Sequence, residues 1–157
     1  MEPTPYRQIR ALYDDDTIAV YQAYAPDIAE PALAAGTFVP PFGLNRMTWI
    51  KPSFLWMAYR SGWATLATSP VRIQWDPEQT LHLQPQPKIR SIQIGLSPEA
   101  VHHYVHDWIT TIEDVTPAMH HIHHLSQTNP AEAQSALPAE RPYPLPLDLA
   151  TQIAATV

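Results

Sequence analysis

The residues whose types and spacing best suit ligand chemistry lie in one run, Arg46 to Trp63, with the sequence RMTWIKPSFLWMAYRSGW. Three tryptophans, a tyrosine and three cations fall within its eighteen residues. A strand is predicted before Lys51 and a helix after Ser53, so both should lie at a corner beside the free N–H groups of a helix N-terminus. Such a corner is where phosphates and other anions are held. Most aromatic residues of the run are expected to be core.

A second segment carries polar groups suited to the same site. Tyr21 and Gln22 interrupt the apolar stretch 17–24, which is predicted to be a strand. Buried polar groups need partners, so these side chains should pair either with a ligand or with one another. The residues predicted to line one concave site are Tyr21, Gln22, Lys51, Ser53 and Arg90.

The histidines suggest a different chemistry. Seven of the eight fall in the segments 102–106 and 120–124, and on helices they form i,i+4 pairs that suit a metal ion. No carboxylate completes a recognised metal motif, so a solvated face is the preferred interpretation and metal binding ranks last. The sequence also has no GxSxG, phosphate-loop or GxGxxG motif, which disfavours hydrolase, kinase and Rossmann functions.

Strands dominate the first two thirds of the chain and helices the last third, which predicts an α+β fold. We expect a mixed or antiparallel sheet with C-terminal helices packed on it. Val101, Val105 and Trp108 recur at helical spacing and should share one buried face. The predicted strands are 17–24, 46–50, 71–75, 81–83 and 89–94, and the predicted helices are 27–35, 54–61, 97–112, 116–127 and 130–136.

Length and composition set further bounds. The 157 residues predict one α+β domain over 1–138, followed by a proline-rich segment and a C-terminal helix or tail over 139–157. The net charge of −6 disfavours an extensive nucleic-acid surface, and the absence of cysteine excludes disulfides and thiolate chemistry. No apolar stretch approaches a membrane span and no signal peptide is visible, so we expect a cytoplasmic protein.

Several segments together resemble the family called domain of unknown function 4291. They are 10–15, 20–24, 28–29, 46–57, 74–78, 90–96 and 114–117. The resemblance runs from about Arg7 to Pro144 and implies no established activity. Family members carry several tens more residues between the positions of Trp63 and Val71, so this chain is a shortened member. We expect a brief loop over 64–70, and an edge covered by the proline-rich tail or by a second copy in a homodimer.

The order of features also resembles the ADP-ribosyltransferase fold, which implies a nucleotide ligand of the NAD type. On this order Tyr21, Gln22 and Gln93 take the catalytic positions, although Gln93 is not the acid that this chemistry uses. The implied cofactor-binding residues are Thr48, Lys51, Ser53, Arg60 and Arg90. The leading hypothesis is therefore an NAD-type transferase. The alternative is a non-enzymatic module that binds a ligand or a protein, for which an exposed apolar patch on 101–112 would argue.

Overall fold

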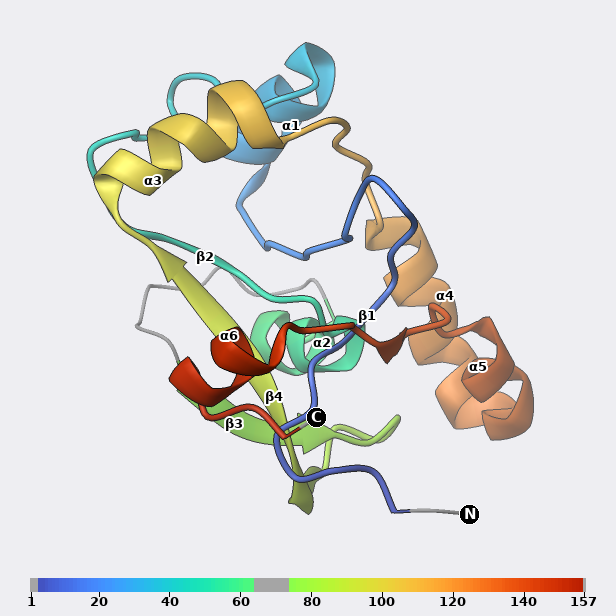
Figure 1. Cartoon of the computed structure of the whole chain (residues 1–157). Coiled ribbons are helices and arrows are strands. Elements are labelled where there is room, and N and C mark those ends of the chain that lie inside the picture. Colours follow the sequence, from blue (N-terminus) through green and yellow to red (C-terminus); the bar gives the residue numbers. More distant parts are fainter. Residues whose placement is uncertain (1–2, 64–73, 157) are drawn as a thin grey trace.

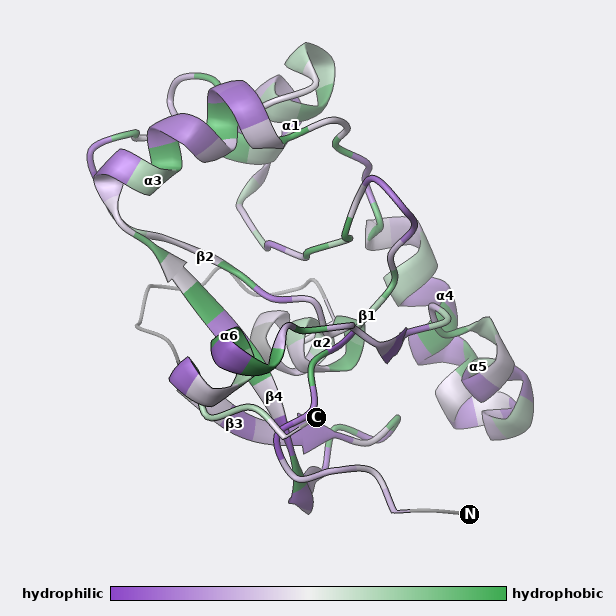
Figure 2. Ribbon diagram, viewed as in Figure 1, coloured by the Kyte–Doolittle hydropathy of each residue, from purple (hydrophilic) through white to green (hydrophobic). Residues whose placement is uncertain are grey.

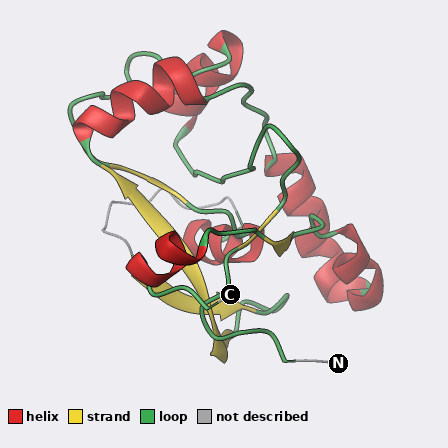
Figure 3. Ribbon diagram, in the orientation of Figure 1, coloured by secondary structure: helices red, strands yellow, loops and turns green. Residues whose placement is uncertain are grey.

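The computed structural model of the chain describes residues 3–63 and 74–156 (Figure 1). Helices and antiparallel strands share the chain, which confirms the predicted α+β class (Figure 3). No helix within the described ranges is both long and apolar enough to span a bilayer. The elements are β1 (Arg10–Ala11), α1 (Pro26–Ala35), β2 (Thr48–Ile50), α2 (Phe54–Ser61), β3 (Gln74–Gln79), β4 (Pro85–Leu96), α3 (Pro98–His103), η1 (Tyr104–Trp108), α4 (Thr116–Thr128), α5 (Pro130–Ala136), β5 (Arg141–Pro142) and α6 (Leu147–Gln152).

The main sheet has the order β2-β4-β3, with β4 antiparallel to both neighbours. Ile50 pairs with Ile94 on one side of β4, and the register of β3 shifts between Pro77 and Glu78. The predicted strand 81–83 is instead part of the turn that joins β3 to β4, where Leu83 adopts a φ of 55°. That left-handed backbone closes a turn and cannot continue a strand.

The predicted strand 17–24 is also wrong. Ile18 and Tyr21 make only isolated bridges, to Tyr13 and to Lys51. Strand propensity reflects the fit of a side chain to a pleated surface, and this segment has no partner along its length to complete a ladder. The predicted loop over 64–70 and the start of the predicted strand 71–75 lie outside the described residues.

Local end signals place α1 and α2 as predicted. Gly36 closes α1 with a φ of 73°, and Gly62 closes α2 with a φ of 56°. Both values lie in the left-handed region that glycine adopts without steric cost. At the start of α2, the Ser53 hydroxyl accepts a hydrogen bond from the Trp56 N–H at 3.1 Å. This cap fixes the direction in which the chain leaves β2.

The predicted helix 97–112 is shorter and changes its winding. After α3 the chain forms the π-helical turn η1, in which the Ile109 N–H donates to the Tyr104 carbonyl five residues back, at 3.0 Å. This wider turn shifts the inward positions, so Ile109 packs on the core while Trp108 is 54% exposed. Val101 and Val105 are buried as predicted, whereas the predicted burial of Trp108 is wrong.

Two apolar clusters form the core. The first joins α2 to the C-terminal helices, and the second joins α1, α3, η1 and the sheet. Figure 2 shows hydrophobic and hydrophilic residues interspersed along α3 and α4, as expected of helices with one buried face. The buried members of the first cluster are Tyr21, Phe54, Trp56, Met57, Ala58, Trp63, Leu81, Met119, Ile122, Leu125 and Ala133. Those of the second are Ala32, Phe38, Phe42, Leu96, Val101, Tyr104 and Val105.

The C-terminal segment lies along the N-terminal one (Figure 1). β5 pairs with β1 antiparallel, so that Arg10 is opposite Pro142. Further along, the Trp75 indole N–H donates to the Ile153 carbonyl at 3.0 Å, and the Thr156 N–H donates to the Arg7 carbonyl at 2.9 Å. The tail therefore attaches to both β1 and β3.

Candidate functional site

Lys51 is the most unusual side chain at the predicted corner, because it is a fully buried cation. It follows β2, and its carbonyl accepts from the Tyr21 N–H at 2.8 Å. Its Nζ lies 3.7 Å from the centroid of the Trp56 ring and donates to the Ser91 carbonyl at 3.4 Å. A cation over an indole face is a favourable pairing in a dry interior.

The carboxylate of Asp76 forms an ion pair with this amine. The Lys51 Nζ and Asp76 Oδ2 atoms are 3.7 Å apart, which is too long for a good hydrogen bond. Asp76 Oδ2 accordingly has no hydrogen-bond partner among the described residues. Burial lowers the pKa of Lys51 to about 7, and the opposing effects of Asp76 and Glu78 do not restore it. The pKa of Lys51 therefore lies far below that of an exposed lysine.

Ser53 connects the lysine corner to a second carboxylate. While its Oγ caps α2, its hydroxyl donates to Glu78 Oε1 at 2.9 Å. The same Glu78 oxygen accepts from the Gln79 N–H at 2.9 Å. Ser53 is 2% exposed, so both hydrogen bonds of its hydroxyl, to the Trp56 N–H and to Glu78, lie inside the protein.

Glu140 supplies a third carboxylate from the proline-rich segment. Its Oε1 accepts from the Phe54 N–H at 2.7 Å, and so occupies a free N–H group at the start of α2. Burial raises the pKa of Glu140 to about 7, and repulsion from Glu78 adds to the rise. The Phe54 N–H and the Arg10 charge oppose the rise but are weaker. Burial, with Glu140 nearby, also raises the pKa of Tyr21.

Gln22 and Thr48 belong to a separate polar network, on the side of α3 and η1. The Tyr104 hydroxyl donates to Gln22 Oε1 at 2.6 Å, and Gln22 Nε2 donates to Tyr24 at 2.9 Å and to Thr48 at 3.2 Å. The Tyr24 and Thr48 hydroxyls are 2.7 Å apart. These groups satisfy one another's hydrogen bonds. For Gln22, pairing within the protein is therefore observed, which is one of the two alternatives given for the predicted site residues.

The remaining predicted site residues lie along β4 or outside the described side chains. Arg90 donates from its Nε to the Tyr6 hydroxyl at 2.9 Å, and its guanidinium lies over the Tyr6 ring. Gln93 is buried, two residues beyond Ser91 on the same strand. The side chain of Arg60 is not among those described.

The sequence predicts Lys51, Ser53 and Tyr21 at this corner, but it does not predict that Glu78 and Glu140 lie beside them. Glu78 gives no distinct signal, because it follows Asp76 and Pro77 within a short strand. Glu140 was the single acid of the segment 139–146, and that isolation was the one available hint. Both residues reach the corner through hydrogen bonds to residues distant in sequence, Ser53 for Glu78 and Phe54 for Glu140, which a sequence motif cannot reveal.

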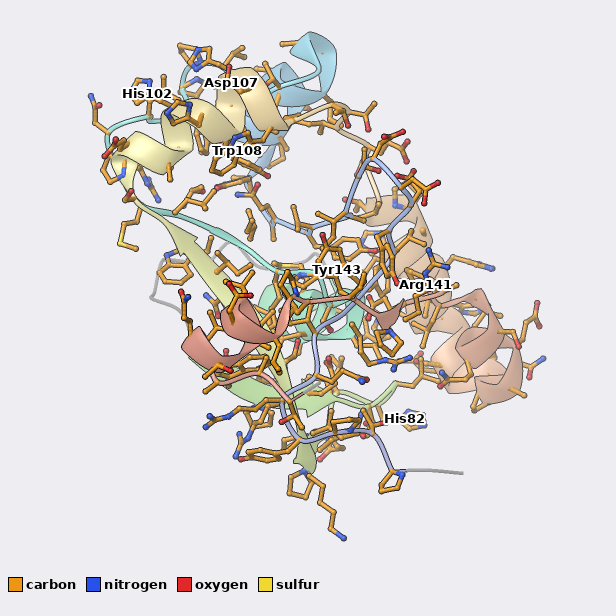
Figure 4. The ribbon with its side chains drawn as sticks, viewed as in Figure 1. His82, His102, Asp107, Trp108, Arg141 and Tyr143 are labelled. Atoms are coloured by element: carbon orange, nitrogen blue, oxygen red, sulfur yellow. The ribbon has the colours of Figure 1, made fainter. Side chains whose placement is uncertain are left out.

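The histidines do not gather into a metal centre. Within 3–63 and 74–156, no three His, Asp or Glu side chains are placed to share an ion. The His102 and His106 rings stack 6.0 Å apart, and His103 Nδ1 lies 2.8 Å from the Asp107 carboxylate. His102, Asp107 and Trp108 lie on the same helical segment, far from His82 (Figure 4). The His103 ring also stacks on Trp108, at 6.2 Å between centroids.

The sequence matches a family model described as domain of unknown function (DUF4291), over residues 8–68 and 65–143. The chain belongs to the DUF4291 family. The DUF4291 match falls into two pieces that meet at 65–68, the position where the sequence predicts a missing family segment. Neither the search of curated proteins nor the search of solved structures returned a match. Membership of the DUF4291 family indicates no activity. A function for this chain is therefore inferred from the candidate site.

Proposed function

We propose that the corner around Lys51 is an acid–base centre, and that this DUF4291 chain is an enzyme of the transferase type acting on a small nucleotide ligand. The observation that supports it is that Glu78 interacts with both a buried amine, Lys51, and a half-buried acid, Glu140, and that desolvation shifts the pKa of each to about 7. General acid–base groups work best with pKa values near the operating pH. Strongly perturbed groups gathered in one cluster are typical of functional sites.

In this proposal Lys51 and Glu140 exchange protons with the ligand, and Tyr21 and Ser53 orient it. Tyr21 lies against the ring of Phe54 in an edge-on contact at 5.5 Å, at the start of α2. Gln93 extends the polar lining along β4, where it takes the position that the ADP-ribosyltransferase order gives to a catalytic acid. Because Gln93 carries no charge, the acid of the proposed reaction is Glu140.

Ligand phosphates need a different set of residues. Lys51 does not suit a phosphate, because Asp76 and Glu78 already place negative charge around it. Phosphate contacts in the proposal therefore fall to Arg60 and Arg90. Gln22 and Thr48 support the corner through the network with Tyr104. NAD is the first ligand to test, because the resemblance of the sequence to the ADP-ribosyltransferase fold implies a ligand of that type.

Binding measurements test the proposal directly. Calorimetry and ligand-observed NMR should detect NAD, ADP-ribose or a mononucleotide with the intact chain, and Lys51→Met should abolish that binding. Methionine keeps an unbranched side chain beside Trp56 and removes the amine, together with its cation–π contact. Lys88→Met is the matched control, because Lys88 lies exposed on β4 and should bind as the wild type does. Absence of binding by the wild type would refute the nucleotide ligand.

The exposed Trp108 favours a second function, that of a non-enzymatic binding module. A half-exposed tryptophan on a π-helical turn is unusual, and such turns frequently lie at functional sites. The same titrations distinguish the two functions. Loss of ligand binding in Lys51→Met with binding retained in Trp108→Ala supports the enzyme, and the reverse result supports the module.

A further inference from the structure

Two arginines lie over the same exposed tyrosine near the start of the chain. The guanidinium carbon of Arg7 is 5.7 Å from the centroid of the Tyr6 ring, and that of Arg90 is 5.5 Å from it. Tyr6 is 44% exposed. Arg90 belongs to β4, whereas Tyr6 and Arg7 precede β1. The fold therefore gathers two cations from distant parts of the sequence at one ring, and we call Arg7 and Arg90 the arginine pair.

Backbone hydrogen bonds fix the position of both arginines. The Arg90 N–H donates to the Tyr6 carbonyl at 2.7 Å, which attaches the N-terminal segment to β4. The Thr156 N–H donates to the Arg7 carbonyl at 2.9 Å, and the Arg7 N–H donates to the Thr156 hydroxyl at 3.3 Å. Because both backbones are held in this way, a ligand of the arginine pair would meet a largely preformed site.

The arginine pair leaves most of its side-chain donors unused within the described part of the chain. A guanidinium group carries five N–H donors. Arg90 donates from Nε to the Tyr6 hydroxyl at 2.9 Å, and its terminal nitrogens make no hydrogen bond to a described residue. The Nε atom of Arg7 is buried and has no hydrogen-bond partner among the residues that the structure describes. A buried donor without a partner is costly, so its presence here points to a missing acceptor.

Two other arginines use their donors inside the protein. Arg10 donates from its terminal nitrogens to the Gln8 side chain at 3.1 Å and to the Glu140 carbonyl at 3.0 Å. Arg141 lies over the Tyr13 ring, much as the arginine pair lies over Tyr6, but it donates to the Tyr13 carbonyl at 3.0 Å. Unused donors are therefore a feature of the arginine pair and not of every stacked arginine in this chain.

No described carboxylate neutralises the arginine pair. Neither of the two ion pairs formed by described residues includes Arg7 or Arg90. The chain as a whole has a net charge of −6, so the pair is not part of a broadly basic protein surface. Planar guanidinium groups bind phosphate oxygens through two parallel N–H donors, and stacking on an aromatic ring leaves those donors available at the ring edge.

We propose that Arg7 and Arg90 form a binding site for a diphosphate group, with one guanidinium on each phosphoryl group and Tyr6 supporting both. A diphosphate suits the pair better than a single carboxylate, because it matches two cations in charge and offers oxygens to both forks. The diphosphate is either free pyrophosphate or part of a nucleotide such as ADP-ribose. For the nucleotide source this inference rests on the proposed function, which gives a phosphate contact to Arg90, and it adds Arg7 as the second contact.

The side-chain Nε–H resonances of the arginines report on binding. In ¹⁵N-resolved NMR of the intact chain, pyrophosphate should shift those of Arg7 and Arg90 until the site is saturated. Calorimetry should show that Arg7→Gln and Arg90→Gln each weaken pyrophosphate binding by about tenfold, the loss expected for one charge-assisted contact. Arg141→Gln is the matched control, and it should change the affinity by less than about twofold, since its donor is already used within the chain.

Three results would overturn the site. They are Arg7 and Arg90 resonances that do not shift with pyrophosphate, an unchanged affinity in either glutamine variant, and an equal shift of the Arg141 resonance, which would mean nonspecific screening of charge. The titration of the wild type needs no substitution, so it decides the question even if a variant fails to fold.

ADP-ribose, titrated in the same way, separates the two sources. Shifts of Arg7 and Arg90 with both compounds support the nucleotide source. Pyrophosphate binding without ADP-ribose binding supports the free anion and refutes only the nucleotide ligand. ADP-ribose binding that leaves the Arg7 and Arg90 resonances unmoved overturns the diphosphate site and leaves the nucleotide ligand standing.

Discussion

Glu140→Gln should make the protein more stable at neutral and mildly alkaline pH. An ordinary glutamate has a pKa of 4.5, and burial beside Glu78 raises that of Glu140 to about 7. Between these values the folded state binds a proton that the unfolded state has released. The free energy of unfolding must therefore fall as pH rises through this range.

The size of the effect follows from the gap between 4.5 and about 7. At 1.36 kcal/mol per pH unit, the wild type loses about 3 kcal/mol between pH 4.5 and 7 through Glu140. Lys51 acts with the opposite sign at higher pH. Its pKa falls from 10.5 to about 7, so above pH 7 the unfolded state binds the extra proton and stability rises again. The two groups together predict a minimum in stability near pH 7.

Urea unfolding followed by circular dichroism at intervals from pH 5 to 9.5 measures this curve. The wild type should show the minimum, and Glu140→Gln should lose the falling limb while it keeps the rise above pH 7. Glu113→Gln, at an exposed position, should follow the wild type. A wild-type curve that is flat or rises between pH 5 and 7 would refute the burial of Glu140 as an ionisable group. An unchanged falling limb in Glu140→Gln would assign the effect to another residue.

Three further substitutions test separate parts of the structure. Ser53→Ala removes the cap of α2 and should lower the free energy of unfolding by about 1–2 kcal/mol in urea titrations. Gly95→Ala should cost about 1–3 kcal/mol, because a Cβ there would lie 2.2 Å from the Trp49 ring, and calorimetry should show a lower Tm. Trp108→Ala should change stability by less than about 0.5 kcal/mol, since the side chain is 54% exposed; a larger loss would mean that Trp108 is buried after all.

The elements predicted correctly are those whose ends are marked by capping residues within the same short stretch of sequence. Ser53 and Gly62 bound α2, and Asn129 caps α5 by accepting from the Glu132 N–H. The segment 17–24 shows the limit of this reasoning. Its composition suits a strand, but a strand also needs a partner, and distant parts of the chain supply only single bridges.

The winding of α3 and η1 shows a second limit. An apolar repeat assumes a constant number of residues per turn, and one π-helical turn moves every later position by about one residue. Val101 and Val105 precede the full effect of that turn and are buried, while Trp108 follows it and is exposed. Nothing in the sequence alone marks where the helix widens.

In the candidate site, too, residues close together in sequence could be predicted, whereas contacts between distant segments could not. Lys51 and Ser53 could be predicted because a strand, a proline and a helix cap adjoin in sequence. Gln22 was assigned to the site of Tyr21, yet it pairs with Tyr104 from the helical segment. Glu140 comes from 86 residues beyond its partner Phe54, and no periodic pattern connects the two. The homodimer remains a prediction that light scattering can test.

The start of α2 connects the sequence prediction to Glu140. The sequence predicts that free N–H groups near Lys51 and Ser53 hold an anion, and the chain places the carboxyl group of Glu140 at one of them. A negatively charged ligand group placed at the Phe54 N–H would therefore compete with Glu140 for one donor. Binding of such a ligand and the hydrogen bond between Phe54 and Glu140 would then exclude each other, and linkage requires that each weakens the other by the same free energy.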